Sequence, residues 1–314
     1  MDGHLLYKVC SMYYIDNLTQ QAIGNRLGVS RMKVARLLYE ARREGLGEVK
    51  LHFNSSQLSE LEAEIERRFN IRECAIVPTF ENTEQMLREM AAALAGILDR
   101  CLEGTKIVGI SWGTTLEAMA RFLQTRRRYD VVIVPIVGSV GLDDSGSYTN
   151  YVTRSFAEKI GGTTRTINVP AVVNSKDEKG VMENVSNTQQ IIDLAKRASV
   201  LLVGISDATI ASSLGKTGNF RQEEIDDLRG LGVIGNVNLV FINAEGEYVD
   251  SKVEERIVRI LTPENMKKAK VRIGIAFGES KVEVIASAMR GGWINFLVTD
   301  EQTAKQVLQK EKRV

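Results

Sequence analysis

Small, hydroxyl-bearing residues follow short apolar segments at several points in the 314-residue sequence. In the segment GISWGTT, Ser111, Gly113, Thr114 and Thr115 stand between a predicted strand and a predicted helix. Backbone N–H groups at the start of a helix, neighbouring hydroxyls and the helix dipole can bind an anion together. Serine and threonine are also the usual helix caps, so this segment alone fits an anion site and a simple capped turn equally well.

Residues of the same character follow other predicted strands. Gly138 and Ser139 follow one strand, Asp207 follows a second and Lys281 follows a third. A carboxylate accepts hydrogen bonds from sugar hydroxyls, an ammonium group binds an anion, and glycine permits close approach of a ligand. Together these positions predict a binding site for a small polyhydroxy ligand, with or without a phosphate group.

Residues for familiar acid–base or metal chemistry are scarce in the same region. The histidines, His4 and His52, both lie in the first 54 residues, and the sequence contains no GxxxxGKS or GxxxxGKT and no Cys/His metal spacing. Carboxylate and lysine chemistry through Asp207, Glu279 or Lys281 is the remaining enzymatic alternative. We therefore expect a binding site without catalytic residues, metal or cofactor.

The elements that position these residues alternate between short apolar strands and helices from about residue 71 onward. The pattern predicts strands at 74–78, 106–112, 131–138, 200–206, 237–243, 271–278 and 294–300, and helices at 84–102, 114–124, 148–160, 185–197, 279–290 and 301–311. Near-continuous apolar strands separated by helices predict an α/β fold, in which helices cover both faces of a mostly parallel sheet. Such sheets bind ligands beyond the carboxyl ends of their strands, where these polar residues occur.

The N-terminal segment LTQQAIGNRLGVSRMKVARLL, residues 18–38, predicts two short helices joined by a sharp turn. Thr19 and Ser30 can cap the two helices, and Gly28 allows the positive φ of the turn between them. Apolar positions at helical spacing predict a three-helix core made of Leu6, Val9, Tyr13, Ile23, Leu27, Val34, Leu37, Leu38 and Ala41.

The other face of the second helix is basic, and its charges lie toward the N-terminal half. That half of a recognition helix enters the major groove of DNA, where arginine binds guanine edges or phosphates and lysine binds phosphates. The pattern also fits a solvated basic face on a purely structural helix pair. The predicted DNA contacts are Gln20, Ser30, Arg31, Met32, Lys33 and Arg36.

Charge supports a separate N-terminal segment on a chain whose net charge is only +1. Residues 1–54 contain 8 Lys/Arg and 5 Asp/Glu, whereas the remainder is slightly acidic. This mildly basic end favours an anionic partner. We assign residues 1–54 to a helix-turn-helix DNA-binding domain, which a short strand at 47–53 can extend as a wing, and residues 71–314 to an effector-binding and oligomerisation domain.

Residues 55–70 form the predicted connector helix between these domains. Leu58, Leu61, Ile65 and Phe69 follow helical spacing, and charged residues occupy the other faces. The apolar stripe fits docking on the following domain and pairing with a second copy of the chain equally well. Pairing would suit DNA operators with dyad symmetry.

Membrane and redox signals are weak. No apolar run approaches the ~18 residues of a membrane span, and MDGHLLYK has no signal-peptide pattern. Cys10, Cys74 and Cys101 are scattered and lack CxxC spacing. We read them as reduced thiols and expect a cytoplasmic protein without a membrane partner.

The N-terminal segment, followed by EARREGLGEVKL, resembles the DNA-binding domain of SorC/DeoR-type sugar-responsive transcriptional regulators. GISWGTT, VPIVGSVG, VGIS and IAFGESKVEVIASAMRGGWINFLVTDEQTAKQVL resemble the effector domain of that family in the same order. The resemblance covers nearly the whole chain, and its C-terminal part is highly specific. It implies a fold like ribose-5-phosphate isomerase and CoA-transferase without catalysis, a homodimer or homotetramer with tetramers favoured, and a sugar, polyol or phosphorylated inducer.

The resemblance also assigns roles to single residues. Gly113, Thr114 and Thr115 match the phosphate-binding turn of the family, Lys281 matches the lysine of its GExK motif, and Asn150 matches an asparagine in the helix after the third strand. Val137 departs from the basic residue of some phosphosugar-binding members, and Asn243 replaces a frequent aspartate, so both free and singly phosphorylated ligands fit. The expected effector contacts are Ser111, Gly113, Thr114, Thr115, Gly138, Ser139, Asn150, Asp207, Asn243 and Lys281.

The sequence therefore predicts a DNA-binding regulator of carbohydrate or polyol catabolism genes. Its expected partners are double-stranded operator DNA, a small sugar, polyol or sugar phosphate, and further copies of itself. The ligand would favour one subunit arrangement and so change the spacing between paired DNA-reading helices. Two alternatives remain: a sugar-phosphate isomerase-like enzyme with a fused helical domain, and an assembly protein whose helix pair only oligomerises.

Overall fold

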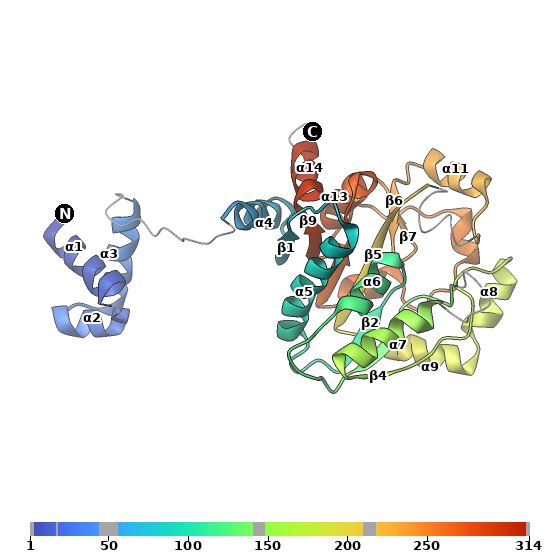
Figure 1. The fold of residues 1–314 in the computed structure, drawn as a ribbon, viewed down its shortest axis with the longest axis horizontal. Helices are drawn as coiled ribbons and strands as arrows, with labels where there is room; N and C mark the ends of the chain where they lie inside the picture. Colours follow the sequence, from blue (N-terminus) through green and yellow to red (C-terminus); the bar gives the residue numbers. More distant parts are fainter. Residues whose placement is uncertain (1–2, 17, 44–55, 141–147, 210–217, 312–314) are drawn as a thin grey trace. The chain divides into compact units, whose positions relative to one another are not determined.

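The computed structural model describes residues 3–16, 18–43, 56–140, 148–209 and 218–311 (Figure 1). The chain divides into two compact units, Met1–Ser56 and Gln57–Val314. Among the described residues, no helix combines the length and the apolar character needed to span a membrane. The wing strand predicted at 47–53 lies outside the described residues.

The N-terminal unit consists of short helices around a small apolar core. Helix α1 (Gly3–Cys10) continues into a π-helical turn, η1 (Ser11–Ile15), and is followed by α2 (Gln20–Leu27) and α3 (Arg31–Arg43). All nine predicted core residues pack in this unit, seven of them buried, with Tyr13 and Leu27 half-buried at the margin.

The caps predicted for α2 and α3 are confirmed. The Thr19 hydroxyl accepts a hydrogen bond from Ala22 N at 3.2 Å, and the Ser30 hydroxyl accepts one from Lys33 N at 3.2 Å. Gly28 ends α2 with φ of 67°, a backbone region in which a side chain would be strained. These residues fix the sharp turn that separates the two helices.

The larger unit is built on a mostly parallel sheet, so the predicted α/β fold class is confirmed. Its strands follow the order β1-β9-β8-β5-β2-β3-β4, in which every neighbouring pair is parallel. In that order the strands are β1 (Glu73–Val77), β9 (Phe296–Asp300), β8 (Val271–Ile275), β5 (Val200–Asp207), β2 (Ile107–Ile110), β3 (Val132–Pro135) and β4 (Thr163–Thr164).

Helices cover both faces of this sheet, because alternate strand residues point to opposite sides. In β5, Val200 and Leu202 pack into one apolar cluster, and Leu201, Val203 and Ile205 pack into the other. The first cluster contains residues of α5 (Thr83–Cys101), α6 (Thr114–Phe122) and α7 (Tyr148–Ile160). The second contains residues of α4 (Ser56–Phe69), α9 (Ser186–Ala195), α12 (Pro263–Lys268), α13 (Val282–Arg290) and α14 (Glu301–Glu311).

Several short elements were not predicted from the sequence. They are β4, α8 (Lys176–Glu183), α11 (Gln222–Gly230), α12 and the 3-10 turn η2 (Lys252–Arg256). The helix predicted at 279–290 begins as a 3-10 turn, η3 (Glu279–Lys281), and continues as α13.

The strand predicted at 237–243 is wrong. This segment forms part of an antiparallel hairpin of β6 (Gly235–Val237) and β7 (Val240–Ile242), which pairs through β6 with β5. The chain reverses at Asn238 and Leu239, whose φ angles are 53° and 60°. Because both turn residues are left-handed, the apolar run VNLVFI folds back on itself instead of extending.

The connector helix α4 docks on the larger unit. Ile65 and Phe69 are buried in the core, and Leu58 and Leu61 pack against it. These contacts bury the apolar stripe that the sequence assigned equally to docking and to pairing between copies.

Two carboxylates of α4 bind the free edge of β1, which is the strand at one end of the sheet (Figure 1). Glu66 Oε1 accepts a hydrogen bond from Cys74 N, and Glu62 Oε1 accepts one from Ile76 N, both at 2.8 Å. One helical turn rises about 6 Å over four residues, and two strand residues span about 6.6 Å, so the spacings match. The helix thus supplies partners to backbone groups that the sheet leaves unpaired.

The negative charge of Glu62 lowers the stability of the folded chain. Burial raises the pKa of Glu62, and the nearby carboxylates of Glu66 and Glu73 raise it further, although the bond from Ile76 opposes them. The folded chain therefore favours protonated Glu62 more than the unfolded chain does, and ionisation above the folded pKa reduces stability.

Glu62→Gln should raise the free energy of unfolding at pH 7 to 8, because the amide oxygen still accepts the Ile76 N–H without a buried charge. The gain should vanish near the unfolded pKa of about 4.3, where wild-type Glu62 is protonated. Urea titrations at both pH values test this, with the exposed Glu60→Gln on the same helix as control. Destabilisation at pH 7 to 8 that disappears near pH 4.3 would contradict this and show that the ionised carboxylate itself is needed.

Candidate functional site

A polar cavity lies at the carboxyl ends of the central strands β2, β5 and β8. Its empty space, including the part that is open to solvent, is about 390 Å³. The lining residues come from the β2–α6 turn, from β5, from the β6–β7 hairpin and from the segment after β8. They are Ser111, Trp112, Gly113, Thr114, Thr115, Leu116, Gly204, Ile205, Ser206, Asn236, Asn238, Ile275 and Lys281.

The β2–α6 turn presents the start of a helix to the cavity. Gly113 is the N-cap residue of α6, with φ of 131°, and Thr114 and Thr115 are the first two helical residues. Glycine has no side chain that could cap the helix, so Thr114 and Thr115 do not occupy the cap position. This geometry favours the anion-site interpretation over the capped turn, because Gly113, Thr114 and Thr115 at the start of the helix all line the cavity.

Lys281 brings a positive charge to the same cavity from the turn after β8. Burial lowers the pKa of Lys281, and the carboxylate of Asp207 opposes that shift. Among the lining residues that the structure describes, Lys281 supplies the positive side-chain charge and none is an aspartate or glutamate. A cation beside a helix N-terminus makes this end of the cavity suitable for a phosphate or another anion.

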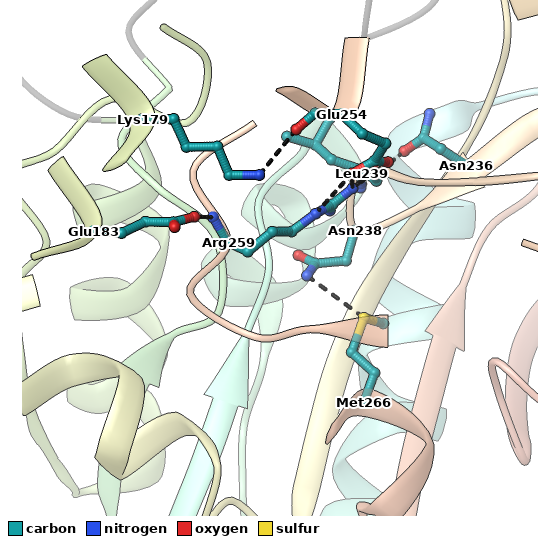
Figure 2. Close-up of polar contacts among 8 residues, drawn as sticks. All are labelled: Lys179, Glu183, Asn236, Asn238, Leu239, Glu254, Arg259 and Met266. Carbon is teal, nitrogen blue, oxygen red and sulfur yellow. Dashed lines mark hydrogen bonds and ion pairs between the residues drawn. The ribbon is translucent and has the colours of Figure 1, made fainter. Parts of the chain in front are cut away.

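The hairpin contributes two asparagines that the sequence analysis missed (Figure 2). Asn238 Oδ1 accepts a hydrogen bond from the Ser111 hydroxyl at 2.6 Å, and Asn238 Nδ2 donates to Ile136 O at 3.2 Å. The Nδ2 atom of Asn236 and the hydroxyl of Ser206 are buried without a hydrogen-bond partner among the described residues. Buried polar atoms beside a cavity are natural partners for ligand hydroxyls, because leaving them unpaired is costly.

A sequence signal for these residues exists. Asn238 interrupts the apolar run VNLVFI, and asparagine tolerates the left-handed backbone of a tight turn better than most residues do. The prediction of one strand at 237–243 left Asn236 outside the strand and placed Asn238 inside it, so neither residue was recognised as part of a turn at the ligand site.

Asp207 lies at the end of β5 and faces Lys281 electrostatically, but it is not among the lining residues. Its Oδ1 atom accepts a hydrogen bond from the Thr209 hydroxyl at 2.6 Å. The connection between Asp207 and the cavity is therefore electrostatic, through the charge of Lys281.

Four other expected effector contacts do not line this cavity. Ser139 N donates to Val169 O at 2.7 Å, and Gly138 packs so closely on the 170–171 backbone that a Cβ atom would lie 2.6 Å from it. Asn150 exchanges side-chain hydrogen bonds of 2.8 and 2.9 Å with the backbone of Ile167.

The fourth, Asn243, closes the turn after β7. Its side chain accepts a bond from Glu247 N at 2.8 Å and donates one to Glu247 Oε2 at 3.0 Å. Structural hydrogen bonds thus explain Asn150 and Asn243, and close backbone packing explains Gly138 and Ser139.

The N-terminal unit presents the expected basic face. Arg31, Met32, Lys33 and Arg36 are exposed on α3, and 78% of Met32 is accessible. Arg36 forms an i,i+4 ion pair with Glu40 at 2.9 Å but remains 78% exposed. Gln20 begins α2 and is half-buried, whereas Ser30 uses its hydroxyl as the cap of α3.

Metal-binding geometry is not found in the described parts of either unit, where no group of three or more His, Cys, Asp or Glu side chains could hold an ion. The α/β unit has a cavity with polar side chains at its strand ends, and the N-terminal unit has an exposed basic helix. This combination is typical of regulators that bind both a small ligand and a nucleic acid. Comparisons with known proteins identify the family.

The Sugar-bind family, a sugar-binding domain, matches residues 54–309. The chain is 29% identical over 312 residues to the sorbitol operon regulator of Klebsiella pneumoniae, covering 98% of each chain. The crystal structure of full-length SorC from that organism superposes with a TM-score of 0.74 at 28% identity, over 98% of this chain and 99% of that one. The chain therefore belongs to the Sugar-bind family and is a SorC-type transcriptional regulator.

Other relatives agree over their full length. The deoxyribonucleoside regulator of Bacillus subtilis (strain 168) is 25% identical, covering 97% of each chain. The erythritol catabolism regulatory protein EryD of Brucella abortus (strain 2308) is 24% identical, covering 98% of this chain and 97% of its own. These relatives are regulators and not enzymes, which decides against the isomerase-like alternative.

Proposed function

We propose that this regulator controls carbohydrate or polyol catabolism genes and that a sugar, polyol or sugar phosphate bound in the strand-end cavity modulates its binding to operator DNA. The observation that carries the proposal is the meeting of Lys281, the N-terminus of α6 and the asparagine-bearing hairpin around one cavity. An anion-binding end and a hydroxyl-binding side suit a ligand that combines both groups.

The relatives support this ligand class. Their names refer to sorbitol, erythritol and deoxyribonucleosides, which all carry two or more hydroxyl groups. In this chain Ser111, Gly113, Thr114, Thr115 and Lys281 would contact the ligand directly. Asp207 would tune the charge of Lys281.

The exposed face of α3 would read the operator. Arg31, Lys33 and Arg36 have the charge and exposure for guanine edges and phosphates, and Met32 can contact base methyl groups. Gln20 and Ser30, at the starts of the two helices, would contact the backbone of the DNA. A homodimer or homotetramer in the cytoplasm would place two such helices on an operator with dyad symmetry.

Arg36→Ala should weaken a specific operator complex by about tenfold or more, since one good base contact contributes ~1–3 kcal/mol. The melting temperature should change little, because the exposed pair with Glu40 contributes ~0–1 kcal/mol. Fluorescence anisotropy with a DNA fragment selected by the wild-type protein measures the first effect, and calorimetry measures the second.

The exposed Arg229 of α11 provides a matched control, because Arg229→Ala removes the same charge from the other unit. If Arg36 contacts only phosphate, the loss should be similar for all DNA sequences, and the slope of log affinity against log salt should fall by about one. Unchanged operator affinity would reject its assigned role.

A further inference from the structure

The hairpin turn at the cavity has an unusual backbone. Asn238 and Leu239 adopt φ angles of 53° and 60°. Asparagine tolerates this left-handed region, but for leucine it is uncommon and costs conformational energy. Leu239 is also buried, at 1% exposure, so it packs in place only while the turn keeps this shape. Surrounding residues must therefore stabilise the turn.

Arg259 supplies that stabilisation from outside the cavity (Figure 2). Its Nη2 atom donates a hydrogen bond to Leu239 O at 2.9 Å. The same guanidinium forms an ion pair with Glu254, in which each side chain is only 10% exposed. A planar guanidinium can donate in two directions at once, which an ammonium group on a flexible stem does less well.

Both partners of this pair are fixed by α8. Lys179 Nζ donates to the backbone oxygen of Glu254, and Glu183 Oε1 accepts from Arg259 N, both at 2.9 Å. In Figure 2 the labelled Lys179 and Glu183 lie on the opposite side of Arg259 from Asn236. The guanidinium thus has a defined position before any ligand binds.

The 238–239 turn also orients the side chain of Asn236. Leu239 N donates to Asn236 Oδ1 at 3.2 Å, so the oxygen of this amide is engaged by the turn. Its Nδ2 atom is then left buried beside the cavity without a partner among the described residues. The orientation of this donor therefore depends on the shape of the turn.

We propose that Arg259, held by Glu254, is a positioning residue for the effector site: it stabilises the 238–239 turn and so directs the Asn236 amide at the ligand without touching the ligand itself. This inference rests on the proposed function, because it assumes that the cavity binds the effector. A purely structural role would explain the ion pair alone, but it would leave effector affinity independent of Arg259.

The first test uses the protein without ligand. Arg259→Lys keeps a positive charge for Glu254 and removes the planar group that also bonds Leu239 O. Hydrogen–deuterium exchange of peptides covering residues 235–242 should accelerate by about tenfold, the equivalent of one hydrogen bond. Arg256→Lys is the matched control, since Arg256 pairs with Glu224 and bonds Val173 O but not the turn. Its exchange in this peptide should stay at the wild-type rate.

The second test measures affinity by calorimetry with sorbitol 6-phosphate and sorbitol as probes. For whichever probe the wild-type protein binds, Arg259→Lys should lower the affinity by about tenfold, and Arg256→Lys should lower it by less than twofold. In the Asn236→Ala background, Arg259→Lys should have little further effect, because the donor that it positions is gone. If Arg259→Lys folds poorly, the double variant Glu254→Gln, Arg259→Met removes both buried charges and serves instead.

The outcomes separate the two claims. Unchanged exchange at 235–242 in Arg259→Lys overturns the positioning role, whatever the probes do. Equal affinity losses in Arg256→Lys, or additive losses with Asn236→Ala, overturn it as well and leave only a structural ion pair. A wild-type protein that binds neither these probes nor the other sugars, polyols and phosphates of a screening panel contradicts the proposed function, while the exchange result still decides the role of Arg259 at the turn.

Discussion

Lys281→Met should weaken the binding of a phosphorylated sugar or polyol by about 10- to 100-fold, since a hydrogen bond to a charged group contributes ~1.5–3 kcal/mol. The methionine side chain retains most of the volume and apolar stem of lysine. The loss should therefore report the missing ammonium group and not a collapsed cavity.

The same variant separates the two kinds of effector. Affinity for the unphosphorylated polyol with the same carbon chain should change by less than about threefold, because hydroxyls gain less from a cation. Lys310→Met, which removes an exposed lysine paired with Glu283, is the control and should bind like the wild type. Calorimetric titrations of all three proteins with both ligands measure this. Equal losses for both ligands would contradict a phosphate role for Lys281.

The protonation of Lys281 gives this site a pH dependence. Burial lowers the pKa of Lys281 below that of an exposed lysine, although Asp207 opposes the shift. Binding of a phosphate needs the charged ammonium, so affinity should decline as the pH rises through this lowered pKa. It should also decline below about pH 6, where the phosphate dianion gains a proton and loses one of its two negative charges.

Ile65→Ala should lower the free energy of unfolding of the larger unit by about 2–5 kcal/mol, as for other fully buried isoleucines. Ile65 has no exposed surface and packs from α4 into the main core. The loss should be the same at low and high protein concentration, because the contact lies within one chain.

Urea unfolding at two protein concentrations tests this, with Ser59→Ala on the exposed face of the same helix as control. Ser59→Ala should change stability by less than about 0.5 kcal/mol. A loss that grows as the protein is diluted would instead indicate that α4 is stabilised by pairing between copies.

Much of the fold could be predicted because its signals are local. The strands that were predicted correctly are short apolar runs, and the predicted helices 148–160 and 301–311 coincide with α7 and α14. Helix α8 was missed because none of its residues is buried, so it has no apolar stripe to read. The hairpin was missed because its turn depends on contacts with Arg259, which lies twenty residues further along the chain.

The candidate site was predictable where one segment carries several of its residues. The GISWGTT turn and Lys281 both line the cavity as expected. Asn150 and Asn243 resembled ligand-binding residues, but their amides bond Ile167 and Glu247 and do not line the cavity. An amide has the same donors and acceptors in either role, so its residue type alone does not reveal which partner it has.

The bonds from Glu62 and Glu66 to β1 bear on how such regulators are recombined. A fusion that joined another DNA reader directly to residue 71 would remove α4 and expose Cys74 N and Ile76 N on an open strand edge. Open edges invite pairing with strands of other molecules, which leads to aggregation. Because α4 protects that edge, a chimaeric sensor built from this effector unit should be joined upstream of residue 56.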